Sequence, residues 1–226
     1  MTLLRNLAFY PLFYGVSAVL VIVSVVAVLV RRAWLRPIVG IWGRWHLWCV
    51  ERLLGIAVVQ EGVIPDEPVL IAMKHESFFE AIDTPRLLAY PAVFAKQELF
   101  RIPGWGYSAR VYGLVPVARD EGARALRAMI ASARERTAAG RPLVIFPEGT
   151  RVPHGSAPPL QAGFAGLYKL LGLPVVPVAV NSGPVYHRVL KRAGQITYKV
   201  GETIPAGLPR EEIEARVHQA INALNS

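Results

Sequence analysis

Charged side chains are missing from a long stretch near the amino terminus. Residues 7–30 form 24 consecutive uncharged positions, which as a helix extend roughly 36 Å at about 1.5 Å per residue. That length exceeds the hydrocarbon thickness of a bilayer, about 30 Å. Arginines follow the stretch at positions 31, 32, 36 and 44, whereas only Arg5 precedes it. The pattern predicts a membrane helix that leaves the rest of the chain in the cytoplasm.

Two alternatives for this stretch stay open. A cleaved secretory signal is disfavoured because the run is longer than the usual apolar core of such signals and has no convincing small-x-small exit. A helix buried in a soluble core is disfavoured by the length of the run.

A second amphipathic helix is expected to start near Pro37. Four of the five tryptophans fall in this region, and one helical stripe is predicted to hold Ile38, Ile41, Trp45, Trp48 and Leu53. Indole rings are typical of the membrane interface. The helix therefore lies at the interface, or returns through the leaflet as the second arm of a hairpin, unless the tryptophans pack on a globular domain.

After Gly55 the pattern changes to short apolar runs separated by amphipathic segments. The runs predict strands at 69–73, 92–95, 114–117, 143–146, 175–180 and 196–200. Helices are predicted at 124–136, 164–171 and 210–224. The alternation indicates an α/β sheet flanked by helices. We expect membrane-anchoring helices in residues 1–56 and a catalytic domain in residues 57–226.

The formal net charge is +9 at pH 7, but the basic residues are scattered and no nucleic-acid-binding motif accompanies them. Anionic lipids and a phosphorylated substrate explain this charge more economically. Cys49 is the single cysteine, which excludes an intrachain disulfide and a cysteine-based metal cluster. We expect it to serve as a small apolar residue.

Polar residues follow two of the predicted strands at the same short distance. His75 lies two residues after the 69–73 run, and Glu148 lies two residues after Phe146. Ligand sites in α/β folds lie at the carboxyl ends of the strands, so one cleft is expected to receive both side chains. Histidine takes up a proton near neutral pH, which makes His75 the candidate general base.

A carboxylate near His75 is expected to hold its ring. Glu80 is the first candidate, because it accepts the second ring proton if a helix starts just after His75. The segment from Ser77 to Glu80 is also a capping box, in which the glutamate bonds to the start of its own helix instead. Asp83 is the rival for the orienting role.

Other chemistries lack their usual motifs. Glu76 follows a histidine as in the zinc-protease signature, but the position of the second histidine holds Phe79. The sequence contains no Gly-x-Ser-x-Gly elbow and no phosphate-binding Gly-x4-Gly-Lys loop. We therefore expect no metal site and no bound cofactor.

Four blocks in order resemble those of the lysophosphatidate (1-acylglycerol-3-phosphate) acyltransferase family, within the glycerolipid acyltransferases. The first is a histidine motif that ends in Glu80 where the family has aspartate. The others are the 94–119 segment with spaced glycines, the Phe-Pro-Glu-Gly-Thr-Arg run at 146–151, and Val-Pro-Val at 176–178. The resemblance spans about residues 70–180 and implies a mixed sheet flanked by helices with an amino-terminal membrane helix or helical hairpin.

The resemblance implies transfer of an acyl group from an acyl thioester to the free hydroxyl of 1-acyl-sn-glycerol-3-phosphate, giving phosphatidate. His75 is then the general base, with Glu80 beside it. The expected substrate-binding residues are Lys96, Arg119, Glu148, Gly149, Thr150 and Arg151. Arg151 is the first choice for the acceptor phosphate, and Glu148 is expected to order the 149–151 turn. The acyl donor is acyl-CoA or acyl-acyl-carrier protein, and a bacterial-type inner membrane is the expected location.

Two other functions stay open. The same chemistry on another lyso-lipid acceptor weakens the requirement for Arg151. A membrane-tethered lipid-binding protein without catalysis is suggested by the replacement of the family's aspartate with Glu80, and it predicts that His75 is dispensable.

Overall fold

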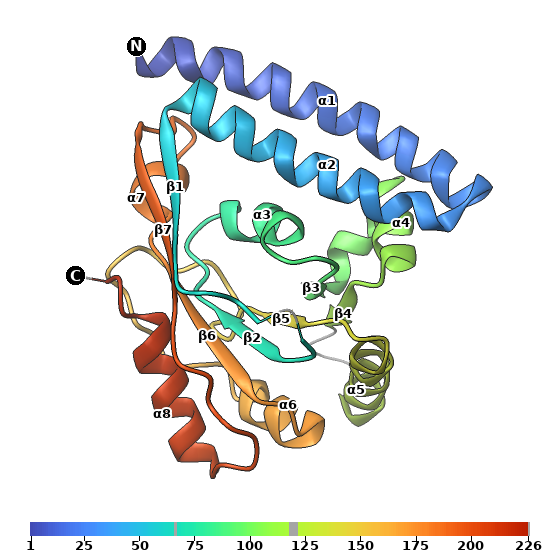
Figure 1. Cartoon of the computed structure of the whole chain (residues 1–226), viewed down its shortest axis with the longest axis vertical. Helices are drawn as coiled ribbons and strands as arrows, with labels where there is room; N and C mark the ends of the chain where they lie inside the picture. The colour runs from blue at the N-terminus through green and yellow to red at the C-terminus, as the bar shows by residue number, and fades with distance from the viewer. Residues whose placement is uncertain (66, 118–121, 226) are drawn as a thin grey trace.

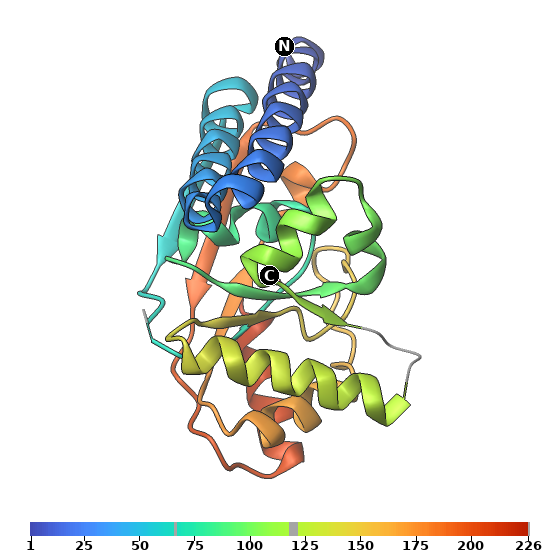
Figure 2. The ribbon, with the colours of Figure 1, turned by 90° about the vertical axis from the view of Figure 1, so that its right-hand side faces the viewer.

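The computed structural model describes residues 1–65, 67–117 and 122–225. The chain begins with two helices that lie side by side along one face of the molecule (Figures 1 and 2). Helix α1 (Thr2–Val30) is followed by a 3₁₀ turn, η1 (Arg32–Trp34), and by the returning helix α2 (Leu35–Trp48). A π-helical segment, η2 (Cys49–Leu54), continues α2 and ends at Gly55. The amino-terminal region is therefore a helical hairpin.

A seven-stranded mixed sheet forms the centre of the rest of the chain. Its strand order is β1-β7-β6-β2-β5-β3-β4, and all neighbours are parallel except β6 and β7. The strands are β1 (Ile56–Glu61), β2 (Leu70–Met73), β3 (Ala92–Lys96), β4 (Val115–Val117), β5 (Leu143–Ile145), β6 (Val175–Val180) and β7 (Gly194–Val200). The central strand β2 lies between β6 and β5.

Successive residues of the central strands enter two different cores. In β2, Ile71 and Met73 lie in a core shared with the hairpin, whereas Leu70 and Ala72 lie in the core on the other face. Side chains of a strand alternate between faces, and a sheet covered on both sides therefore reads as a continuous apolar run. This explains why the 69–73 run is apolar throughout.

Helices cover both faces of the sheet (Figure 1). The hairpin, α3 (Phe79–Leu87) and α7 (Gly183–Tyr186) contribute to one core. The opposite core receives α5 (Gly122–Ala138), α6 (Gly163–Leu171) and α8 (Arg210–Ile221). The 3₁₀ segment η3 (Gln97–Arg101) and α4 (Trp105–Tyr112) follow β3 and lie near the turn of the hairpin. The prediction of a mixed α/β sheet flanked by helices is confirmed.

The six predicted strands all form, within two residues at either end. Strand β1 was not predicted. Its apolar run at 56–59 has only four residues, and this edge strand is largely exposed. The helix α4 was also missed, since its eight residues carry only a short apolar pattern.

One side of α1 belongs to the main core. Phe9 and Phe13 are buried there, together with Cys49 of η2, which is the small apolar residue expected. The outer side of α1 presents many exposed apolar side chains, such as Leu7 and Ile22. Among the described helices, α1 is long and apolar enough to cross a membrane, but it is also packed against the sheet.

The predicted stripe on the second helix is divided between two environments. Trp45 packs against the core, whereas Ile41 and Trp48 are about half exposed. The sequence left open whether these rings pack on the core or face outward, and both environments occur. The helix is the second arm of the hairpin.

Candidate active site

His75 lies just after the carboxyl end of β2, beside the loop that follows β5. Its ring stacks on that of Phe146 with the centroids 4.2 Å apart. The His75 backbone N–H donates to Glu148 Oε2 at 3.0 Å, and its carbonyl accepts from the Val152 N–H at 2.8 Å. The imidazole side chain is 16% exposed. Two strand-end loops thus meet at His75, but the Glu148 side chain is buried beside it and does not line the same cavity as the histidine.

Lys74 and Glu148 form a fully buried ion pair directly beneath this histidine. Lys74 Nζ lies 2.7 Å from Glu148 Oε1, and it also donates to the Ser156 carbonyl and to Asn222 Oδ1. Buried charges are tolerated when they are paired and fully hydrogen-bonded. The pair therefore fixes the loop after β5 against the residues that follow β2.

The expected role of Glu148 differs from the observed one. We expected its carboxylate to order the 149–151 turn, but its described hydrogen bonds come from Lys74 and from the His75 backbone instead. A buried ammonium is a stronger partner than turn amides, which have water available. Glu148 consequently positions His75, and Gly149 closes its own turn by donating to the Phe146 carbonyl at 2.9 Å.

Glu80 is buried at the start of α3 and makes both of the contacts that the sequence left open. Its carboxylate accepts from the Ser77 backbone N–H at 3.2 Å and from the Glu76 N–H at 3.1 Å, as a capping box requires. Glu80 Oε2 also lies 3.7 Å from His75 Nδ1. That distance is too long for a direct hydrogen bond but short enough for a strong charge interaction.

A serine just after β6 also binds the Glu80 carboxylate. Ser182 Oγ donates a short hydrogen bond to Glu80 Oε1 and lies 2.7 Å from Ser77 Oγ. All three side chains are buried. Sequence reasoning missed Ser182, although it follows the predicted 175–180 strand by two residues, which is the same spacing that identified His75.

Asp83, the rival orienting residue, is bound elsewhere. Arg86 donates to both of its carboxylate oxygens at 2.7 Å, and the Tyr198 hydroxyl donates at 3.1 Å. Burial raises the pKa of the Asp83 carboxyl, an effect that these donors oppose. Glu80 is therefore the carboxylate that the structure places next to His75.

Glu76 has a structural partner set that the sequence did not reveal. Its carboxylate accepts from the Gly183 N–H at 2.8 Å and lies 2.9 Å from His154 Nδ1, while its carbonyl contacts His187 Nδ1 at 2.8 Å. Burial raises the pKa of the Glu76 carboxyl, and the Gly183 and His154 hydrogen bonds lower it in part. Within the described residues, no group of three histidine, cysteine or carboxylate side chains is arranged to hold a metal ion.

A mostly apolar cavity of about 950 Å³ opens at His75 and reaches the amino-terminal hairpin. Its wall near the hairpin is formed by Leu20 and Val21 of α1 and by Val39 and Trp42 of α2. Binding sites for small molecules and lipids are usually apolar cavities of this size with a few polar groups. The arrangement accommodates an apolar chain whose reacting end lies at His75.

The basic and turn residues predicted for substrate binding lie at the rim of this cavity. Gly149, Thr150 and Arg151 line it from the loop after β5, and Lys96 lines it from the end of β3. The Arg151 side chain is exposed, and its guanidinium carbon lies 3.9 Å above the centre of the Phe78 ring. Arg119 lies outside the described residues.

The two adjacent phenylalanines have different surroundings. Phe78 is exposed and lines the cavity, whereas Phe79 is fully buried in the core shared with the hairpin. Aromatic residues serve cores and binding sites alike.

The sequence is similar to that of known enzymes. The sequence model of the family described as Acyltransferase matches residues 55–181. The 1-acyl-sn-glycerol-3-phosphate acyltransferase of Pseudomonas aeruginosa is 28% identical over 209 residues, which cover 90% of this chain and 81% of that protein. A protein of the same name from Helicobacter pylori is 28% identical over 145 residues, 62% of this chain and 60% of that protein.

A solved structure shares the fold. The crystal structure of the 1-acyl-sn-glycerophosphate (LPA) acyltransferase PlsC from Thermotoga maritima superposes with a TM-score of 0.77. The match covers 99% of this chain and 95% of that one at 24% sequence identity. The common architecture therefore includes the hairpin as well as the mixed sheet.

Proposed function

The chain belongs to the Acyltransferase family, whose sequence model matches more than half of it, and we propose that it transfers an acyl group from a thioester donor to the free hydroxyl of 1-acyl-sn-glycerol-3-phosphate. The product is phosphatidate. The observation that carries this proposal is that His75 and the basic turn ending at Arg151 meet at one apolar cavity, which also reaches the hairpin. The names of the similar enzymes support the choice of acceptor.

His75 acts as the general base. Because Nδ1 faces Glu80 at 3.7 Å, Nε2 is the ring nitrogen that receives the proton of the acceptor hydroxyl. The hydroxyl oxygen attacks the thioester carbon, the new C–O bond forms as the C–S bond breaks, and the proton passes to the leaving sulfur. General-base assistance of this kind contributes about 10² to 10⁴ in rate.

Glu80 is a positioning residue for this base. Its negative charge stabilises the imidazolium that forms during the transfer, as the carboxylate does in a Ser-His-Asp triad. Ser182 and Ser77 hold the carboxylate in place by hydrogen bonds, and Glu148 fixes the His75 backbone from the other side.

Arg151 binds the phosphate of the acceptor. Guanidinium groups bind phosphate through two parallel hydrogen bonds and stay charged at all relevant pH values. The exposed Arg151 and Lys96 lie at the rim of the cavity, together with Gly149 and Thr150 of the turn. Arg119, which belongs to the same motif set, is assigned to this function from the sequence alone.

The hairpin anchors the enzyme in the membrane. We assign residues 1–56 to the anchor and residues 57–226 to the catalytic domain, on the cytoplasmic side of a bacterial-type inner membrane. The exposed apolar side of α1 supports this assignment. Since hairpin residues also line the cavity, an acyl chain enters the site from the lipid without crossing water.

A transfer assay with the purified full chain in detergent tests the proposal. Acyl-CoA and acyl-acyl-carrier protein are each offered as donors to lysophosphatidate, glycerol-3-phosphate and an uncharged lyso-lipid. We expect turnover with lysophosphatidate above that with either other acceptor. Equal or greater turnover with the uncharged lyso-lipid would show that lysophosphatidate is not the preferred acceptor. No turnover with any donor and acceptor pair would refute the proposed enzymatic activity.

Two histidine variants provide the matched control. His75→Ala should abolish transfer, whereas His218→Ala should not, because His218 lies on α8 and contacts the Ala157 carbonyl away from the cavity. If His75→Ala keeps full activity, the chemistry does not use this base.

A further inference from the structure

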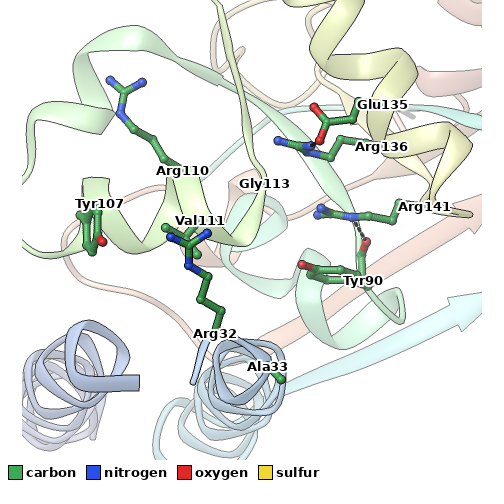
Figure 3. Close-up of a pocket in the computed structure, with 10 residues that line it drawn as sticks. All are labelled: Arg32, Ala33, Tyr90, Tyr107, Arg110, Val111, Gly113, Glu135, Arg136 and Arg141. Carbon is green, nitrogen blue, oxygen red and sulfur yellow. Dashed lines mark hydrogen bonds and ion pairs between the residues drawn. The ribbon is translucent and has the colours of Figure 1, made fainter. Parts of the chain in front are cut away.

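A second cavity, of about 600 Å³, lies apart from His75 (Figure 3). It is enclosed by the turn of the hairpin, by α4, and by the end of α5 with the segment leading to β5. Arg141 lines it from just before β5, at the amino end of that strand. His75 follows the carboxyl end of the parallel strand β2. The second cavity thus lies away from His75, although the His75 cavity reaches the neighbouring residues Pro91, Ala109 and Tyr112.

The described lining of this second cavity is strongly basic. Arg32, Arg136 and Arg141 come from three separate segments and face a common hollow (Figure 3). Arg110 also contributes to the wall, although its guanidinium lies over the Phe100 ring. Glu135 is the acidic residue of the described lining; it lies 2.6 Å from Arg136 Nη1, and its side chain is 72% exposed. Positive charge is thus in excess.

Carbonyl groups and aromatic rings hold Arg141 in place. The residue is only 6% exposed, and it donates to the Tyr90 and Pro91 carbonyls at 2.9 Å. Its guanidinium also lies 3.7 Å above the centre of the Tyr90 ring. Burial and the nearby guanidiniums of Arg136 and Arg36 lower the pKa of Arg141, while Tyr90 and Tyr112 raise it. An anion in the cavity would relieve this repulsion.

A glycine leaves room for the side chains of Arg136 and Arg141. Gly113 ends α4 with φ of 94°, and a Cβ at this position would lie 2.4 Å from Arg141 Nη1 and 2.7 Å from Arg136 Nε. Arg136 Nε is itself buried, without a hydrogen-bond partner in the part of the chain that the structure describes. Arg141 Nη1 and Arg136 Nε therefore lie close together beside Gly113, at the wall of this cavity.

We propose that this second cavity binds a phosphate group, as a site separate from the one at His75. Arginine side chains recognise phosphate by paired hydrogen bonds, and several of them around one hollow favour an anionic ligand over a neutral one. The group is carried by an anionic lipid headgroup or is free in solution. The site would connect Arg32 of the hairpin with Arg136 and Arg141 of the catalytic part.

Its position favours the lipid as the source. Arg32 lies two residues after the end of α1, where Leu29 and Val30 expose most of their apolar surface, and Trp34 is half exposed nearby. Tryptophan and arginine are the residues expected at headgroup depth. A bound headgroup would therefore fix the orientation of the hairpin relative to the sheet.

Isothermal titration calorimetry on the purified full chain in an uncharged detergent tests the site. The probes are dihexanoyl phosphatidylglycerol and inorganic phosphate, with dihexanoyl phosphatidylcholine as the zwitterionic control. We expect the Arg32→Gln/Arg136→Gln variant to bind the anionic probe at least about tenfold more weakly, a change of about 1.4 kcal/mol. The two probes distinguish the sources, because tighter binding of phosphatidylglycerol indicates a headgroup and equal binding indicates a soluble phosphate.

The variant Arg31→Gln/Arg127→Gln is the matched control, since it removes the same charge from exposed neighbours that do not line the cavity. Its affinity should change by less than about twofold. The single variant Arg32→Gln changes only an exposed turn residue, so it tests the site even if the double variant misfolds. It should weaken binding about threefold. Equal losses in the two double variants, or no preference over phosphatidylcholine, would overturn the proposal and leave only diffuse surface charge.

Discussion

The substitution Glu80→Gln separates the two roles that Glu80 combines. The carboxylate caps α3 through the Ser77 and Glu76 amides, and it also lies 3.7 Å from His75 Nδ1. Glutamine has the same shape, so the cavity around the side chain does not change. It removes the negative charge and replaces one acceptor oxygen with a donor.

The structure sets the size of the expected effect. Two unit charges about 4 Å apart interact by about 4 kcal/mol at an effective dielectric constant of 20. At 1.36 kcal/mol per factor of ten, complete loss of this charge interaction corresponds to about a 10³-fold slower reaction. Because His75 is partly exposed to solvent, we expect kcat to fall by about 10² to 10³. Weakening of the cap should also lower the free energy of unfolding by about 1 to 3 kcal/mol.

Initial rates and melting temperatures of the purified variants measure the two effects separately. Glu80→Gln should lower kcat and leave the KM for lysophosphatidate nearly unchanged, because Glu80 contacts the base and not the acceptor. Glu80→Asp keeps the charge, so it should retain part of the activity even if the shorter side chain loses its capping bonds. Ser182→Ala, which removes one of the hydrogen bonds to the carboxylate, should lower kcat by less than Glu80→Gln does.

A purely structural role gives a different pattern. If Glu80→Gln lowers the melting temperature while kcat per folded molecule stays within about threefold, the charge at Glu80 does not assist His75. An active Glu80→Gln together with an inactive Asp83→Asn would transfer the orienting role to Asp83.

Four further results are expected. Arg151→Gln should raise the KM for lysophosphatidate by about 10²-fold at nearly constant kcat, because a charge-assisted bond to phosphate contributes about 1.5 to 3 kcal/mol; initial rates measure this, and an equal loss with an uncharged acceptor would contradict it. Lys74→Met should lower the free energy of unfolding by about 3 to 5 kcal/mol in chemical denaturation, since it leaves Glu148 buried without its ion partner; a wild-type denaturation midpoint would refute this. Asp83→Asn should lower stability by about 3 kcal/mol, because Arg86 loses its carboxylate partner, yet it should keep kcat per folded molecule. Leu20→Trp should shift donor preference toward shorter acyl chains by at least about tenfold in kcat/KM, as added volume shortens the cavity; an unchanged profile would place the acyl chain elsewhere.

Much of the fold was predictable because its signals are local. Buried parallel strands are continuous apolar runs between turns, and six of the seven strands were identified in this way. The exception, β1, has a short apolar run at 56–59 but is a largely exposed edge strand that pairs with β7. Propensity alone carries little information at such an edge.

The candidate site was predictable only in part. His75 and Glu148 were identified by their distance from strand ends, and the structure places them together. The partner of Glu148 was not predicted, because Lys74 pairs with a residue 74 positions away. The contact between Ser182 and Glu80 joins residues 102 positions apart and likewise depends on β2 lying directly beside β6.

The sequence by itself determined the amino-terminal apolar helix, the alternating strands and helices, and the base and acid at two strand ends, because periodicity and strand-end position are properties of neighbouring residues. The tertiary structure decided how these parts combine. It packed one side of α1 into the core, gave Glu80 both a cap and a histidine to contact, and gathered Arg32, Arg136 and Arg141 around one hollow. The order of strands and the packing of helices bring such distant groups together, and no local pattern encodes either.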